Sequence, residues 1–569
     1  MNSTVSAACL RAVPTLRCSS DYREDSEAER MADCRADHSG TPLSPFMSAQ
    51  GWFLAVALAT APALASPTPR SPSKTLLQRG AELYTLKCLA CHGSDGSGDG
   101  EAAYLLYPKP RDLRRGSYRI TSTWDATPTD QDLYATITRG MPGSAMPSWA
   151  HLPESDRWAL VHYIKSLSKR PLLVPPSKAP DLEEGDDGEG VIEAPREPAD
   201  TREGRARGAV HFAQNCESCH GPFGQGDGPR VETLEDASGY PIRPRDLTTG
   251  VFKGDPSPAS IYRRIVGGIA DTPMPAHPHL IGDDAWDLVH FVRSLSSDEL
   301  RERAEMRRIE LLCSRVETLP DHPDAGAWRD IPGATLHLMP LWWRYSRPEY
   351  VKVQAAHDGK SMAILLAWAD ETHDEMAVRP QDFRDAAAVQ FATTQDPPFF
   401  AMGTKGDFVN IWMWKSDRQA DLAGFHDIDT QYPNTGIDSY PNLQRSPYEQ
   451  PMRHAATLEA DATFITAWGA GNIVADPTLR SAAEDLRAQG FGTLKARPMA
   501  DQAVEASGVY KTGSYRVVLR RELKGKGREA VDLKPGRKVP AAFAIWNGSA
   551  GDRDGKKSVT IWQDFVLAE

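Results

Sequence analysis

The sequence predicts a multidomain protein in which two all-α domains are followed by one all-β domain, a β-sandwich. Its 569 residues exceed what one hydrophobic core normally holds, since domains of about 150 residues are typical. A segment with the same ordered motifs occurs twice, once from Cys88 and again from Cys216. From about residue 320, short alternating or β-branched runs stand between Gly, Asp and Pro, which is typical of strands.

Composition and charge narrow the functional classes. Hydrophobic residues make up 40% of the chain and charged residues 25%, as in folded globular proteins. The formal net charge of -12 argues against nucleic acid as a partner, because nucleic-acid binding depends on clustered cationic charge. The one strongly apolar stretch, 52–65, is shorter than the roughly 20 residues of a membrane-spanning helix. We therefore expect no transmembrane anchor in the mature chain.

Residues 1–65 are predicted to be a leader that contains a signal peptide. A short apolar run over 53–61 is followed by Ala63-Leu-Ala65, the small-x-small pattern that signal peptidase accepts. Cleavage after Ala65 would export the protein to the periplasm. A buried helix is the alternative, but prolines crowd the end of the apolar run. The region before the run is acidic where a signal peptide is basic, so Met31 and Met47 are alternative translation starts.

Four of the eight cysteines lie in two C-x-x-C-H motifs, Cys88-Leu-Ala-Cys91-His92 and Cys216-Glu-Ser-Cys219-His220. From this composition, chance would produce roughly 0.003 such motifs. The spacing suits covalent haem, because two thiols one helical turn apart add to the vinyl groups and the next imidazole binds the iron. Zinc needs four ligands, and a thioredoxin-type site needs no following histidine. The sequence therefore predicts two covalently bound haem c groups.

The motif is the start of a longer repeat, whose further pieces recur in the same order. They are a Gly-rich stretch (93–100 and 221–228), Pro-Arg-Asp-Leu (110–113 and 244–247), Met-Pro (146–147 and 274–275) and a Trp-x-x-Val-His helix (158–167 and 286–295). Each copy resembles a class I cytochrome c, over 76–170 and 205–298. The resemblance implies an opening helix with the motif, a Met-bearing loop and a closing amphipathic helix.

The same resemblance implies a methionine as the distal iron ligand in each copy. Met146 and Met274 follow their motif histidines, His92 and His220, at the same spacing in the sequence. Met141 competes in the first copy, but Ile269 stands at the equivalent place in the second. A His/Met pair raises the reduction potential and fills both axial positions, so catalysis on a small molecule at these irons is not expected.

Two segments connect the predicted domains. Residues 171–204 are acidic and rich in Pro and Gly, so we expect a solvated, extended linker that lets the first cytochrome domain move. Its acidity also suits docking of a basic partner. Residues 299–319 are predicted to be a charged helical connector in which Cys313 is a plain, unreactive thiol.

Residues 320–569 resemble the haem b-binding domain of the ethylbenzene dehydrogenase γ-subunit type. The resemblance spans about 325–568 and rests on an ordered set of segments: 353–359, 366–370, 385–391, 401–403, 410–415, 469–472, 490–493 and 557–562. It implies a β-sandwich that holds one b haem between a Met and a Lys, here Met402 and Lys557, with residues 416–466 as an insertion. Because strand side chains alternate, Lys557 is expected to point inward and Lys556 outward.

Taken together, the sequence predicts an exported multihaem electron-transfer subunit, not an enzyme by itself. One b haem would relay single electrons to or from the two c haems. The resemblance implies a molybdopterin catalytic subunit and an iron–sulfur subunit as partners, with soluble or membrane redox carriers beyond them. A dihaem peroxidase is one alternative and would need an open axial position. A dihaem cytochrome c with a haem-free, carbohydrate- or surface-binding sandwich is the other.

Overall fold

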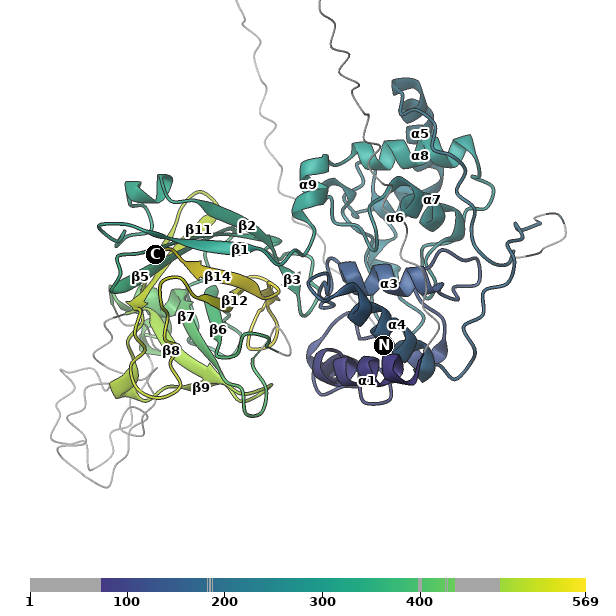
Figure 1. The fold of residues 1–569 in the computed structure, drawn as a ribbon. Coiled ribbons are helices and arrows are strands. Elements are labelled where there is room, and N and C mark those ends of the chain that lie inside the picture. Colours follow the sequence, from purple (N-terminus) through teal and green to yellow (C-terminus); the bar gives the residue numbers. More distant parts are fainter. Residues whose placement is uncertain are drawn as a thin grey trace, which may run out of the picture. The chain divides into compact units, whose positions relative to one another are not determined.

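The computed structural model describes residues 73–181, 183, 186, 188–397, 402–424, 426, 428–434 and 481–569. The predicted leader, with its cleavage site after Ala65, lies outside these residues, as does most of the predicted insertion. By residue contacts, Thr68–Glu569 form one unit. Two sets of helices come first along the chain, and the strands follow (Figure 1). In the described part of the chain, no helix is long and apolar enough to cross a membrane.

The first helical module contains four α-helices and two short 3-10 helices. They are α1 (Lys74–Lys87), α2 (Leu89–His92), η1 (Ala103–Leu105), η2 (Leu113–Arg115), α3 (Asp130–Arg139) and α4 (Glu154–Leu167). Helix α1 begins where the Ser73 side chain accepts a hydrogen bond from the Leu76 N–H. It packs against α4 at Gly80, where a Cβ atom would overlap the carbonyl oxygen of Ala159. Only glycine allows this approach.

The second helical module repeats the first element by element. It contains α5 (Arg202–Asn215), α6 (Glu217–His220), η3 (Val231–Thr233), η4 (Leu247–Thr249), α7 (Pro258–Gly267) and α8 (Asp283–Ser294). Its crossing glycine, Gly208, packs against the carbonyl oxygen of Asp287 on α8. In the sequence repeat, Gly208 corresponds to Gly80 and Asp287 corresponds to Ala159. The sequence repeat is therefore also a structural repeat.

The segment between the modules is more ordered than its composition predicts. The Trp124 N–H donates to the Gly190 carbonyl at 3.1 Å, and the Ile192 N–H donates to the Ser122 carbonyl at 2.7 Å. Ile192 is 1% exposed and packs in the core of the second module. The expectation of a solvated linker over 171–204 is therefore wrong for this part, because an apolar side chain follows the acidic run and is buried.

The predicted helical connector over 299–319 is also shorter than expected. Helix α9 (Asp298–Arg303) ends early, and strand β1 (Glu310–Arg315) follows. This strand pairs in parallel with β4 (Tyr350–His357) and β14 (Gln563–Leu567), so the sheet domain begins before residue 320. Leu311 and Cys313 alternate with exposed residues and face the core. Cys313 is a fully buried core thiol, and burial raises its pKa.

The C-terminal domain is built from fourteen strands in the described residues. Those not yet introduced are β2 (Gly333–His337), β3 (Met339–Pro340), β5 (Ser361–Ala369), β6 (Ala386–Ala392), β7 (Val409–Lys415), β8 (Ala483–Ala488), β9 (Lys495–Ala496), β10 (Glu505–Tyr510), β11 (Ser514–Glu522), β12 (Lys538–Trp546) and β13 (Ser558–Val559). The main hydrogen-bonded order is β10-β11-β5-β4-β1-β14-β12-β6-β7-β8-β9. Short helices α10 (Ser416–Asp421) and α11 (Ile428–Gln431) follow β7.

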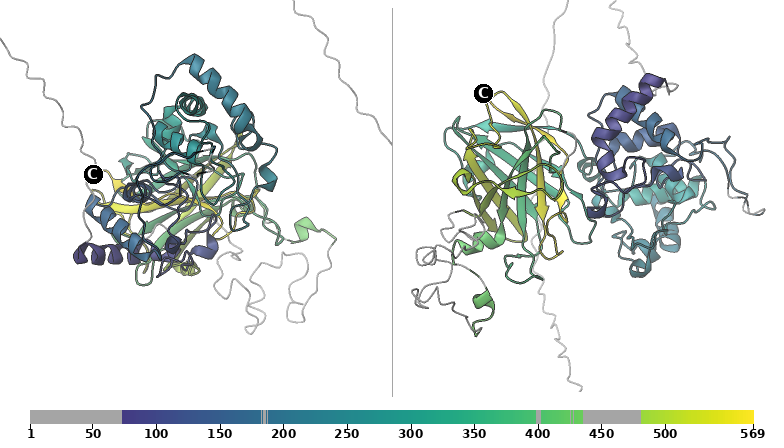
Figure 2. Two further views of the ribbon diagram at one scale, coloured as in Figure 1. Left: turned by 90° about the vertical axis from the view of Figure 1, so that its right-hand side faces the viewer. Right: turned by 90° about the horizontal axis from the view of Figure 1, so that it is seen from below.

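This sheet folds over on itself around a common core. Trp414 on β7 lies 6.3 Å from Trp368 on β5 and 5.5 Å from Tyr515 on β11, measured between ring centroids. These strands are distant in the hydrogen-bonded order, so the two ends of the sheet face each other across the aromatic core. Two further views show the strands around that core (Figure 2). The predicted fold class, helical domains followed by a β-sandwich, is confirmed.

Candidate haem-binding sites

The first C-x-x-C-H motif forms a single helical turn at the end of α1. The N–H groups of Cys91 and His92 both donate to the Cys88 carbonyl, at 3.1 and 2.9 Å. The second motif repeats both bonds, at 3.1 and 2.8 Å. Each turn therefore presents two thiols and one imidazole from neighbouring backbone positions, which is the arrangement that covalent haem attachment requires.

The glycines after the first motif hold this turn in place. The Gly98 N–H donates to the His92 carbonyl at 2.9 Å, and the Gly100 N–H donates to the Cys91 carbonyl at 3.1 Å. A Cβ atom on Gly100 would overlap the carbonyl oxygen of Ala90. The Gly-rich stretch is thus needed for close backbone contact around the motif.

The motif side chains are in environments that favour their neutral forms. Burial raises the pKa of the Cys88, Cys91 and Cys216 thiols to about 12. Burial also lowers the pKa of His92, and it lowers that of His220 to about 4. The His92 Nδ1 lies 3.1 Å from the Arg111 carbonyl oxygen, which leaves Nε2 for an iron. Neutral imidazole is the form that binds metal.

In the second module, one cavity brings both candidate iron ligands together. Its lining includes Cys216, Cys219, His220 and Met274 among mostly apolar side chains. Lys253 also lines it, and burial lowers the pKa of this amine to about 7. An apolar cavity with two thiols, an imidazole, a thioether and basic side chains such as Arg245 fits a haem, whose ring is apolar and whose propionates are anionic.

The methionine loops of the two modules have the same backbone arrangement. The Met141 N–H donates to the Met146 carbonyl at 3.0 Å, and the Ile269 N–H donates to the Met274 carbonyl at 3.2 Å. Met146 and Met274 are both half-buried. Because Ile269 occupies the Met141 position, a common distal ligand favours Met146. The assignment of Met146 and Met274 to the irons stays a prediction.

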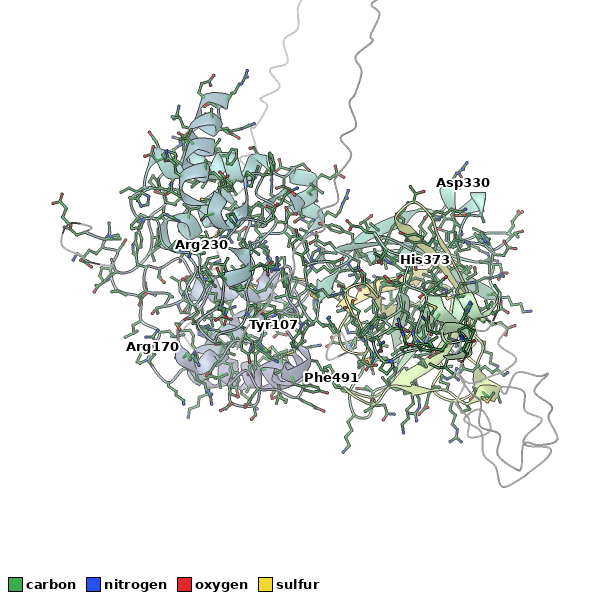
Figure 3. All side chains as sticks on the ribbon, turned by 180° about the vertical axis from the view of Figure 1, so that it is seen from behind. Tyr107, Arg170, Arg230, Asp330, His373 and Phe491 are labelled. Atoms are coloured by element: carbon green, nitrogen blue, oxygen red, sulfur yellow. The ribbon has the colours of Figure 1, made fainter. Side chains whose placement is uncertain are left out.

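The sandwich contains a cavity of about 870 Å³ that brings Met402 and Lys557 together. These residues are far apart in the sequence, yet the Lys557 Nζ lies 4.0 Å from the Met402 Sδ. Most of the lining is apolar, with Ile411, Phe491 and Val559 as examples. Phe491 is labelled in Figure 3. The size and lining of the cavity suit a large planar group with an apolar body.

The surroundings of Lys557 favour a neutral amine. Its side chain is 8% exposed, and its Nζ lies 4.8 Å from the centroid of the Trp546 ring. Burial lowers the pKa of Lys557 to about 8, although nearby Asp554 acts in the opposite direction. Lys556 is half-buried, and its Nζ donates to the Ala550 carbonyl at 2.6 Å. The two neighbouring lysines therefore have different surroundings. Strand alternation does not account for this difference, because β13 begins only at Ser558 and neither lysine lies in it.

Met402 is held in an unusual backbone conformation. Its φ angle of 60° lies in the left-handed region, which non-glycine residues rarely adopt. The Met402 N–H donates to the Gln390 Oε1 at 3.3 Å, and the Gly490 N–H donates to the Met402 carbonyl at 2.6 Å. Strained residues of this kind concentrate at functional sites. A thioether, a buried amine with a lowered pKa and an apolar cavity together fit a haem b.

Several residues that line the sandwich cavity are not predicted by the sequence. Tyr104, Leu105 and Leu106 belong to the first helical module and nevertheless form part of its lining. Lys415 and Glu484, which form an ion pair at 2.6 Å, also line it. The charged pair lies within strands β7 and β8, but no local pattern marks the three residues from the other domain.

Two family models match the chain. The cytochrome c model matches residues 77–168 and 205–296, which contain the two helical modules. The ethylbenzene dehydrogenase model matches residues 326–558 in the sandwich. Both candidate types of haem site therefore lie within matched regions.

Three curated relatives match about two fifths of the chain. A respiratory nitrate reductase heme subunit of Haloferax mediterranei is 26% identical over 44% of this chain and 69% of the relative. The chlorate reductase subunit gamma of Ideonella dechloratans is 23% identical, over 42% and 77%. The dimethylsulfide dehydrogenase subunit gamma of Rhodovulum sulfidophilum is 24% identical, over 42% and 73%. The chain thus combines two cytochrome c domains with one domain of the ethylbenzene dehydrogenase family.

Proposed function

We propose that this protein is an exported electron-transfer subunit that carries two haem c groups and one haem b. It would pass single electrons between a partner oxidoreductase and other periplasmic carriers, without a catalytic centre of its own. The names of the relatives support this role, since they describe heme or gamma subunits of reductases and a dehydrogenase. By the family resemblance, the partners are a molybdopterin subunit and an iron–sulfur subunit.

The convergence of Met402 and Lys557 in the sandwich cavity carries this proposal. Met402 and Lys557 would hold a haem in this cavity through a thioether and an amine, and a haem held in this way would supply single-electron transfer. The Lys557 amine must lose its proton to bind iron, and its burial lowers the cost of doing so. Lys557 is buried and Met402 is half-buried, so both donor atoms lie in a largely apolar lining.

The haem content of the purified full-length protein tests the proposal. A pyridine haemochrome spectrum is expected to give two c haems and one b haem per chain. A spectrum with c haem alone would contradict the proposal and favour a haem-free binding sandwich. Molybdenum that copurifies with the tagged chain from its native host would support the proposed partner, and its absence from a stable complex would contradict that part.

Single substitutions test the ligand assignment in the sandwich. Lys557→Ala should lose the b haem or convert its spectrum, with both c haems retained, because one axial donor is removed. Lys556→Ala is the matched control and should change little, since that amine bonds the Ala550 carbonyl. Equal b-haem content and identical ligand-sensitive spectra in wild type and Lys557→Ala would refute the assignment.

A further inference from the structure

We propose that the first cytochrome domain forms one wall of the haem cavity in the sandwich, so that the b-haem site is complete only when both domains contribute. The wall is the segment Tyr104–Leu106, which lines the cavity together with Met402 and Lys557. This inference rests on the proposed function only in taking the ligand of the cavity to be a haem. The binding residues that it adds lie in the first cytochrome domain, outside the C-terminal domain that resembles the haem b-binding family.

Direct packing connects this wall to the loop that bears Lys557. A Cβ atom built on Gly555 would lie 3.0 Å from the Leu105 Cδ2, so the leucine side chain rests on the Gly555 backbone. Gly555 stands just before Lys557 in the same loop. Leu106 is buried and belongs to the same apolar cluster against which Met402 packs. The wall therefore contacts the surroundings of both candidate ligands.

Backbone hydrogen bonds hold the wall in register with the sandwich. The Tyr107 N–H donates to the Leu341 carbonyl at 2.9 Å, and the Trp343 N–H donates to the Tyr107 carbonyl at 2.7 Å. The Leu341 N–H in turn donates to the Lys557 carbonyl at 2.9 Å. A continuous set of main-chain bonds thus runs from the end of the cytochrome segment to the candidate ligand, and Tyr107 is labelled in Figure 3.

The wall is also attached to the first haem c motif. The Ala102 N–H donates to the Ala90 carbonyl at 2.7 Å, inside the C-x-x-C-H turn. Ala102 is fully buried in the apolar cluster of the cavity, and Cys91 packs against the same cluster. One short segment therefore connects the first C-x-x-C-H turn with the apolar cluster of the sandwich cavity.

The second cytochrome domain provides an internal control for this assignment. Tyr104 is 65% exposed and Leu105 is half-buried, whereas the second copy has Glu232 and Thr233 at these positions, both exposed. The buried leucine at the end of the turn is kept, as Leu106 in one copy and Leu234 in the other. The apolar residues at these two positions thus occur in the copy whose turn lines the cavity, as expected for a cavity wall.

The test compares leucine substitutions in the full-length, haem-loaded protein. Leu105→Asp should admit water to the cavity and speed transfer of b haem to apomyoglobin on the order of tenfold. It should also lower the b-haem midpoint potential, because a wetter site stabilises the charged ferric form. Leu105→Thr, the residue of the second copy, should show a smaller change in the same direction. Leu173→Asp is the matched control, since Leu173 is 77% exposed and does not line the cavity.

The outcomes separate this inference from the proposed function. Unchanged haem transfer and b-haem potential in both Leu105 variants, with two intact c haems, would overturn the shared wall while leaving the proposed function in place. A wild-type protein without b haem would overturn both. If Leu105→Asp fails to fold, the Leu105→Thr result decides, because threonine occupies the equivalent turn in the second copy.

Discussion

The two cytochrome domains have the same haem motif geometry but different surfaces. Both have the same motif turn, methionine loop and glycine-mediated helix crossing. They differ at Asp95, which pairs with Arg114 in the first copy, and at the equivalent Phe223, which is 69% exposed in the second. The first copy also packs its Ala102 and Leu106 into the sandwich cluster. The duplication thus retained the site and changed the surface around it.

The contacts between the two copies follow their repeat. Arg111 of the first copy pairs with Asp271 in the methionine loop of the second, at 2.6 Å. Arg245, the equivalent arginine, donates to the carbonyl oxygens of Pro142 and Gly143 in the methionine loop of the first, at 3.1 and 3.0 Å. Gly143 and Asp271 are themselves equivalent positions. Each arginine therefore reaches the same point of the other copy, but only one of them meets a carboxylate.

Substitution of the two haem-attachment cysteines in each copy should give the largest difference between the copies, measured as b-haem content. Cys216→Ala/Cys219→Ala is expected to abolish one c haem and leave the b haem intact. Cys88→Ala/Cys91→Ala should abolish the other c haem and also weaken b-haem retention, because Cys91 packs against the cluster that lines the sandwich cavity. Haemochrome spectra of both double variants measure this. Equal b-haem content in the two would show that the copies are equivalent for the sandwich.

Ligand exchange should act on both copies alike. Met146→His and Met274→His should each lower one c-haem potential by a sizeable part of the about 0.8 V range that axial ligands span, since imidazole stabilises Fe(III) relative to a thioether. Redox titration of the single variants measures the shift. If Met141→His shifted the potential and Met146→His did not, the distal ligand of the first copy would be misassigned.

Added volume at the helix crossings should destabilise both modules to a similar extent. Gly80→Ala and Gly208→Ala each place a Cβ atom against a backbone carbonyl oxygen, and overpacking of this kind costs about 1–3 kcal/mol. Urea unfolding followed by circular dichroism reports the free energy. Gly326→Ala is the control, because nothing lies within 4 Å of its Cβ position. A neutral effect at either crossing would argue against the packing described for it.

The smallest expected effect concerns the pH dependence of the contact between the copies. Burial raises the pKa of Asp236, but hydrogen bonds from Arg119 of the other copy and from the N–H groups of Ser238 and Tyr240 outweigh it, so the pKa is lowered. A lowered folded-state pKa gives stabilisation above the ordinary aspartate pKa of about 3.9, which is lost as the pH falls through the folded value.

Asp236→Asn should therefore cost about 1 kcal/mol of unfolding free energy at neutral pH and much less near pH 3. Urea unfolding of wild type and variant between about pH 6 and pH 3 measures the difference. A difference that does not shrink at low pH would contradict an electrostatic role for this carboxylate.

The sequence by itself determined the parts that depend on local spacing. Covalent haem attachment needs two thiols and an imidazole within one short motif, and the repeat of such patterns marks both cytochrome domains. Strand patterns and the ordered family segments predicted the sandwich, and the family model confirms it.

Only the tertiary structure decided the parts that depend on distant contacts. The connector around Cys313 is rich in charge and has a composition typical of a helix. In the structure it forms a strand that pairs with β4 and β14, and its alternate residues are buried. The linker is acidic, yet burial of Ile192 in the second module orders part of it. No local pattern marks Leu105 as a residue of the sandwich cavity, because its place in the lining depends on contact with Gly555, which is distant in the sequence and adjacent in space. The strand around Cys313, the ordered part of the linker and the place of Leu105 all depend on packing between segments that are distant in the sequence. Local propensity does not encode such packing.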